Sequence, residues 1–280
     1  MKRPLDQLAE IAQEAVGIGT QLIKRSRPKT VTEKVDRDTY TDVDVQIERA
    51  VRAYLAEATP DIGFIGEEEG RSVSISNENR YWTLDPIDGT ANYVHGLPLC
   101  AVQIALIIDE TTTVAAIDLP YMDSRYIATL GHGSYVNGTR MRISGTTSLS
   151  KSIVSIGDYA TGSDSESRNR PRFKLTSELA QKVERIRMFG SAAHDLVWMA
   201  EGKTDATVIL SNNILDIAPG ALIAREAGAR VGDTDNDEYS TKSPNIIAAT
   251  PGVYSDIARL VTTSLRYFDI NTSDENVPPL

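Results

Sequence analysis

The sequence predicts a layered protein of mixed α+β and α/β class, with an antiparallel sheet in its first half and alternating strands and helices in its second. From Tyr81 to about Ser144, apolar residues form strand-length runs, and Asn137-Gly138 is a strong hairpin signal. From about Lys151, short apolar runs alternate with helical segments, as in α/β units. We therefore expect an α+β half over 1–146, an α/β half over 147–268, and a disordered tail over 269–280.

The N-terminal region predicts two helices. Apolar residues from Leu5 to Ile23 recur on one face of the first. A second helix is expected to follow Thr41, because Thr41 and Asp44 have the spacing of a capping box and an apolar stripe continues through Leu55. Strands are then expected at 62–65, 81–84, 101–108, 112–119 and 125–130, with a hairpin over 134–143.

The second half predicts short strands and helices in alternation, over 153–156, 175–182, 185–189, 192–200, 206–210, 216–227, 246–249 and 254–265. The polar segment 161–172 is expected to be an exposed loop, and a mobile flap is the alternative.

Composition and charge exclude several classes of function. The net charge is -10 and the pI is near 4.9, which argues against a nucleic-acid or anionic-membrane surface. No run approaches the roughly twenty apolar residues of a membrane span, and the N-terminus leads into an amphipathic helix. A cytoplasmic protein is the expectation, with the single Cys100 as a buried core thiol.

The run Asp85-Pro86-Ile87-Asp88-Gly89-Thr90 places two carboxylates a short turn apart, directly after a predicted strand. Hard divalent cations such as Mg²⁺ prefer such oxygen ligands. A plain turn is the alternative, because Asp-Pro and Asp-Gly are both common turn dipeptides.

Two other segments supply carboxylates. Glu67 follows a short apolar strand and can face inward, although an acidic surface loop is the alternative. Asp216 begins a predicted helix, where it can cap the helix and also bind a metal. Helix amides following Gly89 can hold a phosphate. Together these residues suggest a site in which two or three Mg²⁺ ions and a phosphate monoester meet, with Glu67, Asp85, Asp88, Asp216 and the Ile87 carbonyl as ligands.

Two motifs resemble the signatures of the inositol monophosphatase superfamily of magnesium-dependent, lithium-sensitive phosphatases. The first is Asp85-Pro86-Ile87-Asp88-Gly89-Thr90-Ala91-Asn92-Tyr93-Val94-His95-Gly96-Leu97-Pro98, and the second runs from Asp216-Ile217-Ala218-Pro219-Gly220 to Glu226-Ala227-Gly228. Gly66-Glu67-Glu68 and Gly190-Ser191-Ala192-Ala193 are also similar, and the resemblance extends from the first helix to about Leu260. It implies an α-β-α-β-α sandwich of the inositol monophosphatase and fructose-1,6-bisphosphatase type, usually a homodimer.

The resemblance also implies roles for individual residues. Glu67, Asp85 and the Ile87 carbonyl would bind one metal ion, Asp85, Asp88 and Asp216 a second, and Glu67 would help to hold a third. Thr90 with Asp44 resembles the couple that activates water. Gly89, Thr90 and, by looser correspondence, Lys34 would contact the phosphate, while Asp88, Ser191, Ala192 and Ile209 would contact the rest of the substrate.

The substrate is less well defined by the sequence. Ile209 stands where inositol-specific relatives have a glutamate that binds a ring hydroxyl, and Leu215 replaces a usual tryptophan. An isoleucine cannot accept a hydrogen bond, which disfavours inositol phosphate relative to other sugar phosphates or histidinol phosphate. The alternatives are 3'-phosphoadenosine 5'-phosphate, fructose 1,6-bisphosphate, or a catalytically silent protein that binds a metabolite or a protein partner.

Overall fold

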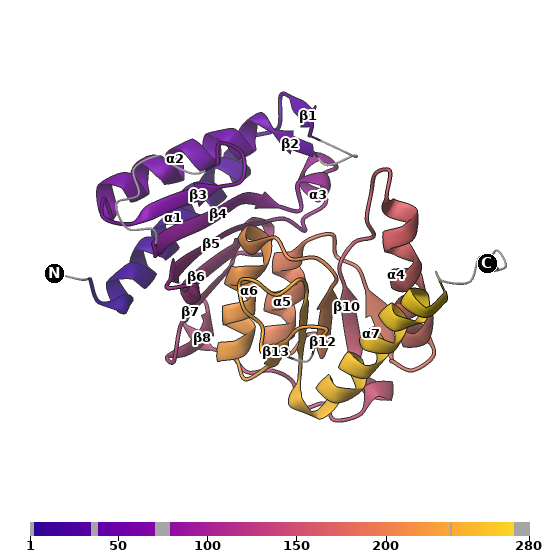
Figure 1. Cartoon of the computed structure of the whole chain (residues 1–280). Coiled ribbons are helices and arrows are strands. Elements are labelled where there is room, and N and C mark those ends of the chain that lie inside the picture. The colour runs from indigo at the N-terminus through magenta and orange to yellow at the C-terminus, as the bar shows by residue number, and fades with distance from the viewer. Residues whose placement is uncertain (1–2, 35–38, 71–78, 236, 272–280) are drawn as a thin grey trace.

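The computed structural model describes residues 3–34, 39–70, 79–235 and 237–271, which form five alternating layers of helices and sheets (Figure 1). Helices α1 and α2 cover one face of a seven-stranded sheet, and α5 and α6 pack between that sheet and a second, five-stranded one. Helices α4 and α7 cover the outer face of the second sheet. The α-β-α-β-α sandwich expected from the sequence is therefore confirmed.

The seven-stranded sheet is antiparallel except at one edge, where β3 and β4 run parallel. Its strand order is β3 to β9 in sequence, and all of the expected first-half strands are present. Both residues of the expected Asn137-Gly138 turn have positive φ, of 48° and 79°, as a two-residue hairpin requires. The strands are β3 (Gly63–Gly66), β4 (Arg80–Asp88), β5 (Ala101–Ile108), β6 (Thr111–Leu119), β7 (Ser124–Thr129), β8 (Gly133–Val136) and β9 (Thr139–Arg140).

The five-stranded sheet has the order β11-β10-β12-β14-β13. Strand β10 pairs in parallel with both β11 and β12, whereas β14 pairs antiparallel with β12 and β13. Its strands are β10 (Ile153–Ile156), β11 (Arg185–Arg187), β12 (Ala206–Ile209), β13 (Arg230–Gly232) and β14 (Ile246–Ala249). A small antiparallel pair, β1 (Val31–Glu33) and β2 (Thr39–Thr41), precedes α2.

The two predicted N-terminal helices are confirmed as α1 (Leu5–Arg25) and α2 (Asp42–Ala58). The buried residues of both helices recur at helical spacing and pack on the first sheet with Trp82, Leu84 and Ile104. Thr41 forms the expected capping box with Asp44. This cap fixes the start of α2 next to the end of β4.

The central helices α5 (Ala192–Ala200) and α6 (Ile214–Glu226) approach each other closely. A Cβ added at Gly220 of α6 would lie 2.6 Å from side-chain atoms of Leu196 of α5. Residues of α5 and α6 belong to one core with strands of both sheets. This shared core fixes α6, the helix that carries Asp216, against both sheets.

Two sequence expectations are corrected in the outer layer. The segment 161–172, expected as an exposed loop, enters helix α4 (Ser165–Ala180), because Leu175 and Leu179 further along anchor that helix on the second sheet and α7. Helix α7 (Pro251–Asn271) includes residues 269–271 of the expected tail, whereas 272–280 lie outside the described residues. Within the described residues, no helix has the length and apolar character needed to cross a membrane.

Candidate active site

Strand β4 ends in an irregularity that directs two carboxylates to the same place. Asp85 pairs with Gln103 of β5 and Asp88 with Ala101, so three steps on β4 face two on β5. Side chains alternate along a regular strand, and residues three apart would point to opposite faces. The bulge removes that alternation, and Asp85, Ile87 and Asp88 all line one cavity.

The acidic turn after β3 is held by a buried glutamate that the sequence did not single out. Glu48 of α2 accepts hydrogen bonds from the backbone amides of Glu68 (2.7 Å) and Glu69 (3.0 Å). Gly66 is necessary there, because a Cβ would lie within 2.5 Å of the Glu48 carboxylate. Glu48 thereby fixes the turn that presents Glu67 to the cavity.

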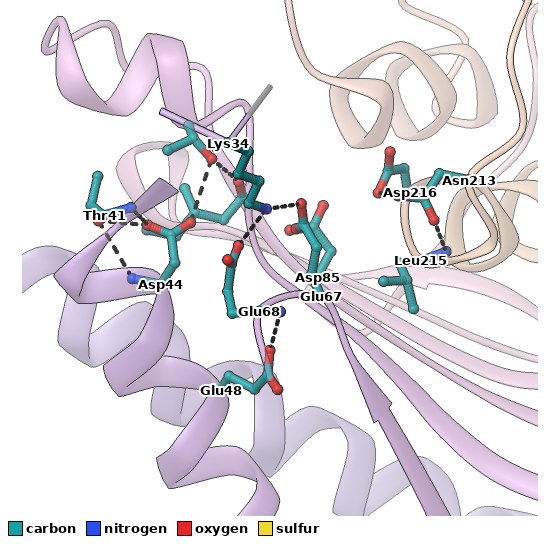
Figure 2. A network of polar contacts seen from close by, with 12 residues as sticks. Lys34, Thr41, Asp44, Glu48, Glu67, Glu68, Asp85, Asn213, Leu215 and Asp216 are labelled. Carbon is teal, nitrogen blue, oxygen red and sulfur yellow. Dashed lines mark hydrogen bonds and ion pairs between the residues drawn. The ribbon is translucent and has the colours of Figure 1, made fainter. Parts of the chain in front are cut away.

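Lys34 lies beside this turn and is engaged by two carboxylates. Its ammonium nitrogen is 2.8 Å from Glu67 Oε1 and 2.8 Å from Glu68 Oε1, and Figure 2 shows Asp85 next to Glu67. Burial, opposed by Lys34, raises the pKa of Glu68 to about 7. Lys34 is not among the residues that line the cavity, so a contact with phosphate requires it to leave this pairing.

The turn from β4 into helix α3 (Thr90–Val94) brings Thr90 close to Asp44. Gly89 has a φ of 81°, and a Cβ there would lie 2.7 Å from the Leu99 carbonyl oxygen. The Thr90 hydroxyl donates to the Ile87 carbonyl at 2.8 Å and lies 3.4 Å from Asp44 Oδ1. Asp44 Oδ2 accepts from the Thr41 amide at 2.9 Å, and burial raises the pKa of Asp44 to about 6.

Asp88 is held by the first turn of α5. The amides of Ala192 (3.2 Å) and Ala193 (3.0 Å) and the Ser191 hydroxyl all donate to its carboxylate. Burial nevertheless raises the pKa of Asp88 to about 6, because these hydrogen bonds offset it only in part.

His194 supports Ser191 from behind. Ser191 Oγ and His194 Nδ1 are 2.7 Å apart, and the single Ser191 proton is donated to Asp88, so Nδ1 carries the ring proton. Burial lowers the pKa of His194 to about 4, which keeps the ring neutral. His194 therefore positions Ser191, and through it the Asp88 carboxylate.

Asp216 reaches the cavity from α6. The sequence expected it to cap this helix, but Asn213 is the cap, and its side chain accepts from the Leu215 amide and donates to Asp216 Oδ1 at 2.9 Å (Figure 2). Pro219 is accordingly the sixth residue of the helix and not part of its first turn.

One cavity of about 560 Å³ collects most of the predicted residues. It is lined by Glu67, Asp85, Ile87, Asp88, Gly89, Thr90, Ser191, Ala192, Ile209 and Asp216. Asp44 and Lys34 lie outside the lining, behind Thr90 and Glu67 respectively. Cavity residues that the sequence did not indicate include Asp158, Arg168, Arg172 and Asp195, three of which flank or fall in the segment expected as a loop.

The carboxylates offer the ligand atoms that a divalent cation prefers, but they are not yet arranged around a common point. The described residues contain no group of three or more His, Cys, Asp or Glu side chains arranged as a metal site. Asp85 Oδ1, however, is buried without a hydrogen-bond partner. Burial, then the Glu67, Asp216 and Asp88 carboxylates, raise the pKa of Asp85 well above its usual value. An oxygen-only set with this much mutual repulsion, in which Asp85 and Asp88 are buried, suits Mg²⁺, whose charge would relieve the repulsion.

Comparisons with known proteins agree with one another over most of the chain. A family sequence model, described as the inositol monophosphatase family, matches residues 4–266. The inositol-1-monophosphatase ImpA of Mycolicibacterium smegmatis is 32% identical over 238 residues, covering 85% of each chain. A fructose-1,6-bisphosphatase/inositol-1-monophosphatase of Thermotoga maritima is 29% identical, covering 80% of this chain and 83% of its own. The crystal structure of the extragenic suppressor protein SuhB from Bartonella henselae matches with a TM-score of 0.84 at 27% identity, covering 90% of this chain and 97% of its own.

Proposed function

The chain belongs to the inositol monophosphatase family, as its motifs led us to expect, and on this premise we propose that it hydrolyses a small-molecule phosphate monoester in a magnesium-dependent reaction. One observation carries the proposal most strongly. Four carboxylates from three distant segments, those of Glu67, Asp85, Asp88 and Asp216, line a single cavity. Such a concentration of negative charge, with Asp85 and Asp88 buried, is unfavourable without a cation, and a phosphate ester needs the same cation for recognition.

Glu67, Asp85 and the Ile87 carbonyl would hold one Mg²⁺ ion, and Asp85, Asp88 and Asp216 a second. A third would be held more weakly through Glu67. When bound, Mg²⁺ would supply the positive charge that phosphoryl transfer to water requires. The Ser191 hydroxyl and the α5 amides orient the Asp88 carboxylate for this task.

The chain's own residues can orient the nucleophile. The Thr90 hydroxyl has one proton, and when it is donated to Asp44 the hydroxyl oxygen can accept a hydrogen bond from water. Thr41 holds Asp44 in place for that exchange. The phosphate would contact the backbone at Gly89 and Thr90, with Lys34 as a further partner once it is released from Glu67.

The substrate proposal follows from Ile209, which lies at the end of β12, is 5% exposed and lines the cavity. Its apolar side chain cannot accept a hydroxyl hydrogen bond, so we favour a sugar phosphate or histidinol phosphate over inositol 1-phosphate. The catalytically silent alternative is disfavoured because each proposed carboxylate ligand is present and placed at the cavity.

Phosphate release across a panel of esters tests the proposal, with Mg²⁺ and with chelator. The panel contains inositol 1-phosphate, histidinol phosphate, fructose 1-phosphate, fructose 1,6-bisphosphate and 3'-phosphoadenosine 5'-phosphate. We expect release that depends on Mg²⁺ and is weak for inositol 1-phosphate. Binding of Mg²⁺ and phosphate without release from any ester would contradict the enzymatic proposal and favour the silent one.

The oligomeric state and the location are proposals of the same kind. We propose a homodimer, supported by the family resemblance. We also propose that it works in the cytoplasm, supported by the single buried Cys100, which leaves the chain without an internal disulfide. Sedimentation velocity at micromolar concentration measures the first, and cell fractionation the second.

A further inference from the structure

Helix α4 brings two arginines into the cavity that holds the carboxylates. Arg168 and Arg172 both line it, together with Tyr159 and Asp158 from the segment before α4. The helix is fixed to that segment by Asn169, whose side-chain amide exchanges two hydrogen bonds with the backbone of Ala160, at 2.7 and 2.8 Å. The arginines are therefore part of an ordered wall.

The spacing of the two arginines places both on the face of α4 that lines the cavity. Residues four apart lie on one helix face, so Arg168 and Arg172 point the same way, while Arg170 between them points elsewhere. Arg170 pairs with Glu166 at 2.7 Å and does not line the cavity. Two like charges at this spacing repel each other, which makes the pair unfavourable unless an anion lies between or beside them.

No carboxylate neutralises this pair among the residues that the structure describes. Neither Arg168 nor Arg172 takes part in an ion pair there, although Arg170 and Lys174 of α4 do. Arg172 donates to the Leu210 carbonyl at 2.8 Å, which anchors its half-buried guanidinium near the end of β12. Asp158 and Asp195 also line the cavity, but neither is hydrogen-bonded to these arginines.

We propose that Arg168 and Arg172 form a subsite for a second phosphate group of the substrate, remote from the phosphate that is hydrolysed. The proposal rests on the proposed function, because the carboxylate end of the cavity is taken as the place of hydrolysis. Guanidinium groups bind phosphate oxygens through paired, charge-assisted hydrogen bonds. A cavity of about 560 Å³ is within the range that holds a small bisphosphate. Among the esters considered from the sequence, this shifts the preference toward bisphosphates, despite the acidic balance of the chain.

The test compares fructose 1,6-bisphosphate with fructose 1-phosphate, which lacks the remote phosphate. In the wild type, kcat/KM is expected to favour the bisphosphate. Arg168→Gln and Arg172→Gln should each lower kcat/KM for the bisphosphate by about ten-fold or more, and that for the monophosphate by less than about two-fold. Arg170→Gln, on the same helix, is the matched control and should change neither.

Calorimetric titration of both sugars into the chelator-treated protein measures the subsite without turnover. The bisphosphate should bind more tightly than the monophosphate, and Arg168→Gln should remove the difference. Because Arg168 is exposed, its substitution tests the idea even where Arg172→Gln fails to fold. Equal losses for both substrates, or equal binding of both sugars to the wild type, would overturn the subsite. Absence of release from every monoester, with the binding difference intact, would overturn the proposed function instead.

Discussion

At the scale of single residues, Asp88 is a proposed metal ligand whose carboxylate is fixed in position, because a hydroxyl and two amides all donate hydrogen bonds to it. Asp88→Asn keeps the size of the side chain but removes the charge and places an amide nitrogen opposite those donors. We expect phosphate release to fall by at least about 100-fold with little change in secondary structure. Release assays and circular dichroism measure the two effects.

A matched control is Glu69→Gln, which removes an equal charge from the same region. Glu69 pairs with Arg49 at the surface and does not line the cavity. Near-normal turnover is expected for this variant. Comparable turnover in Asp88→Asn would contradict the metal-binding role of Asp88.

Lys34 gives a second prediction, because its ammonium group supplies the positive charge between Glu67 and Glu68. Lys34→Met should destabilise the metal-free protein by leaving two carboxylates without their partner. Added Mg²⁺ should then raise the Tm of the variant by more than it raises that of the wild type. Thermal unfolding with chelator and with a Mg²⁺ series measures both. Lys24→Met, which breaks the exposed pair with Asp123, should leave the Mg²⁺ response unchanged.

The sequence predicted the individual carboxylates of the site more fully than their neighbours. Asp85, Asp88 and Asp216 stand in motifs whose residue types and spacing suffice to propose a role. Glu48 carries no such signal, because a glutamate within a helix is ordinary, and only the fold shows that its buried carboxylate binds the turn after β3. The sequence did not indicate Arg168 either, because its proposed role depends on which elements surround the cavity.

At the scale of elements, the start of α2 joins stability to the proposed chemistry. Thr41 caps the helix and also donates backbone and hydroxyl hydrogen bonds to Asp44. Thr41→Ala should lower the free energy of unfolding by about 1 kcal/mol through the lost cap. It should also reduce kcat, because Asp44 loses the hydrogen bond from the Thr41 hydroxyl and keeps only the one from the backbone amide.

The control for this prediction is Thr41→Ser, which retains the hydroxyl and should recover both properties. Chemical denaturation and steady-state kinetics separate the two effects. Loss of stability with unchanged kcat would contradict the role of the Thr41 hydroxyl in holding Asp44 toward Thr90.

The contact of α5 with α6 is a second element-scale test. At Gly220 a Cβ would lie 2.6 Å from Leu196, so Gly220→Ala should force the two helices apart and cost about 1–3 kcal/mol of unfolding free energy. Because Asp216 lies one turn earlier on α6, Mg²⁺ affinity should weaken as well. Gly145→Ala is the matched control, since a Cβ there would meet nothing within 4 Å. Equal stability of the two variants in urea would contradict the packing argument.

The helices and strands that the sequence predicted well are those with regular apolar periodicity, such as α1 and β5. Helix α4 was missed over its first half because that part contains Ser, Asn, Arg and Pro171 and buries only Asn169 before Leu175. Strand β13 was missed because it has three residues and only Val231 and Gly232 are buried. In both cases the tertiary contacts, and not local preference, decide the structure.

At the scale of the whole molecule, the five layers bring together segments that are far apart in the chain. Glu67 follows an edge strand of one sheet, Asp85 and Asp88 end its neighbour, and Asp216 lies on a helix between the two sheets. The division of the chain near residue 146 stays a prediction, and the core shared by α5, α6 and both sheets couples the two parts. The stability of the whole fold should therefore respond to the charge of the cavity.

This coupling predicts how pH acts on the metal-free protein. Burial raises the pKa of Glu68 to about 7 and holds those of Asp85 and Asp195 well above their usual values. The native state then binds more protons than the unfolded state, so stability present at lower pH is lost as pH rises through these folded-state values. His194 has the opposite effect on stability, because its pKa is lowered to about 4 and stability therefore rises with pH. This rise is complete above the ordinary histidine pKa of 6.5.

Between pH 6.5 and 8 the carboxyl groups with raised pKa values should therefore determine how stability changes with pH. With chelator present, the free energy of unfolding should fall as pH rises, by at most about 1.4 kcal/mol per pH unit for each proton released. Saturating Mg²⁺ should flatten this slope, because the cation replaces the protons, and it should raise the Tm more at pH 8 than at pH 6.5. Asp85→Asn removes one of the buried charges, so its metal-free slope should be shallower and its Mg²⁺ response smaller. Denaturant unfolding at several pH values measures all of these, and a metal-free stability that rises from pH 6.5 to 8 would contradict the charge coupling.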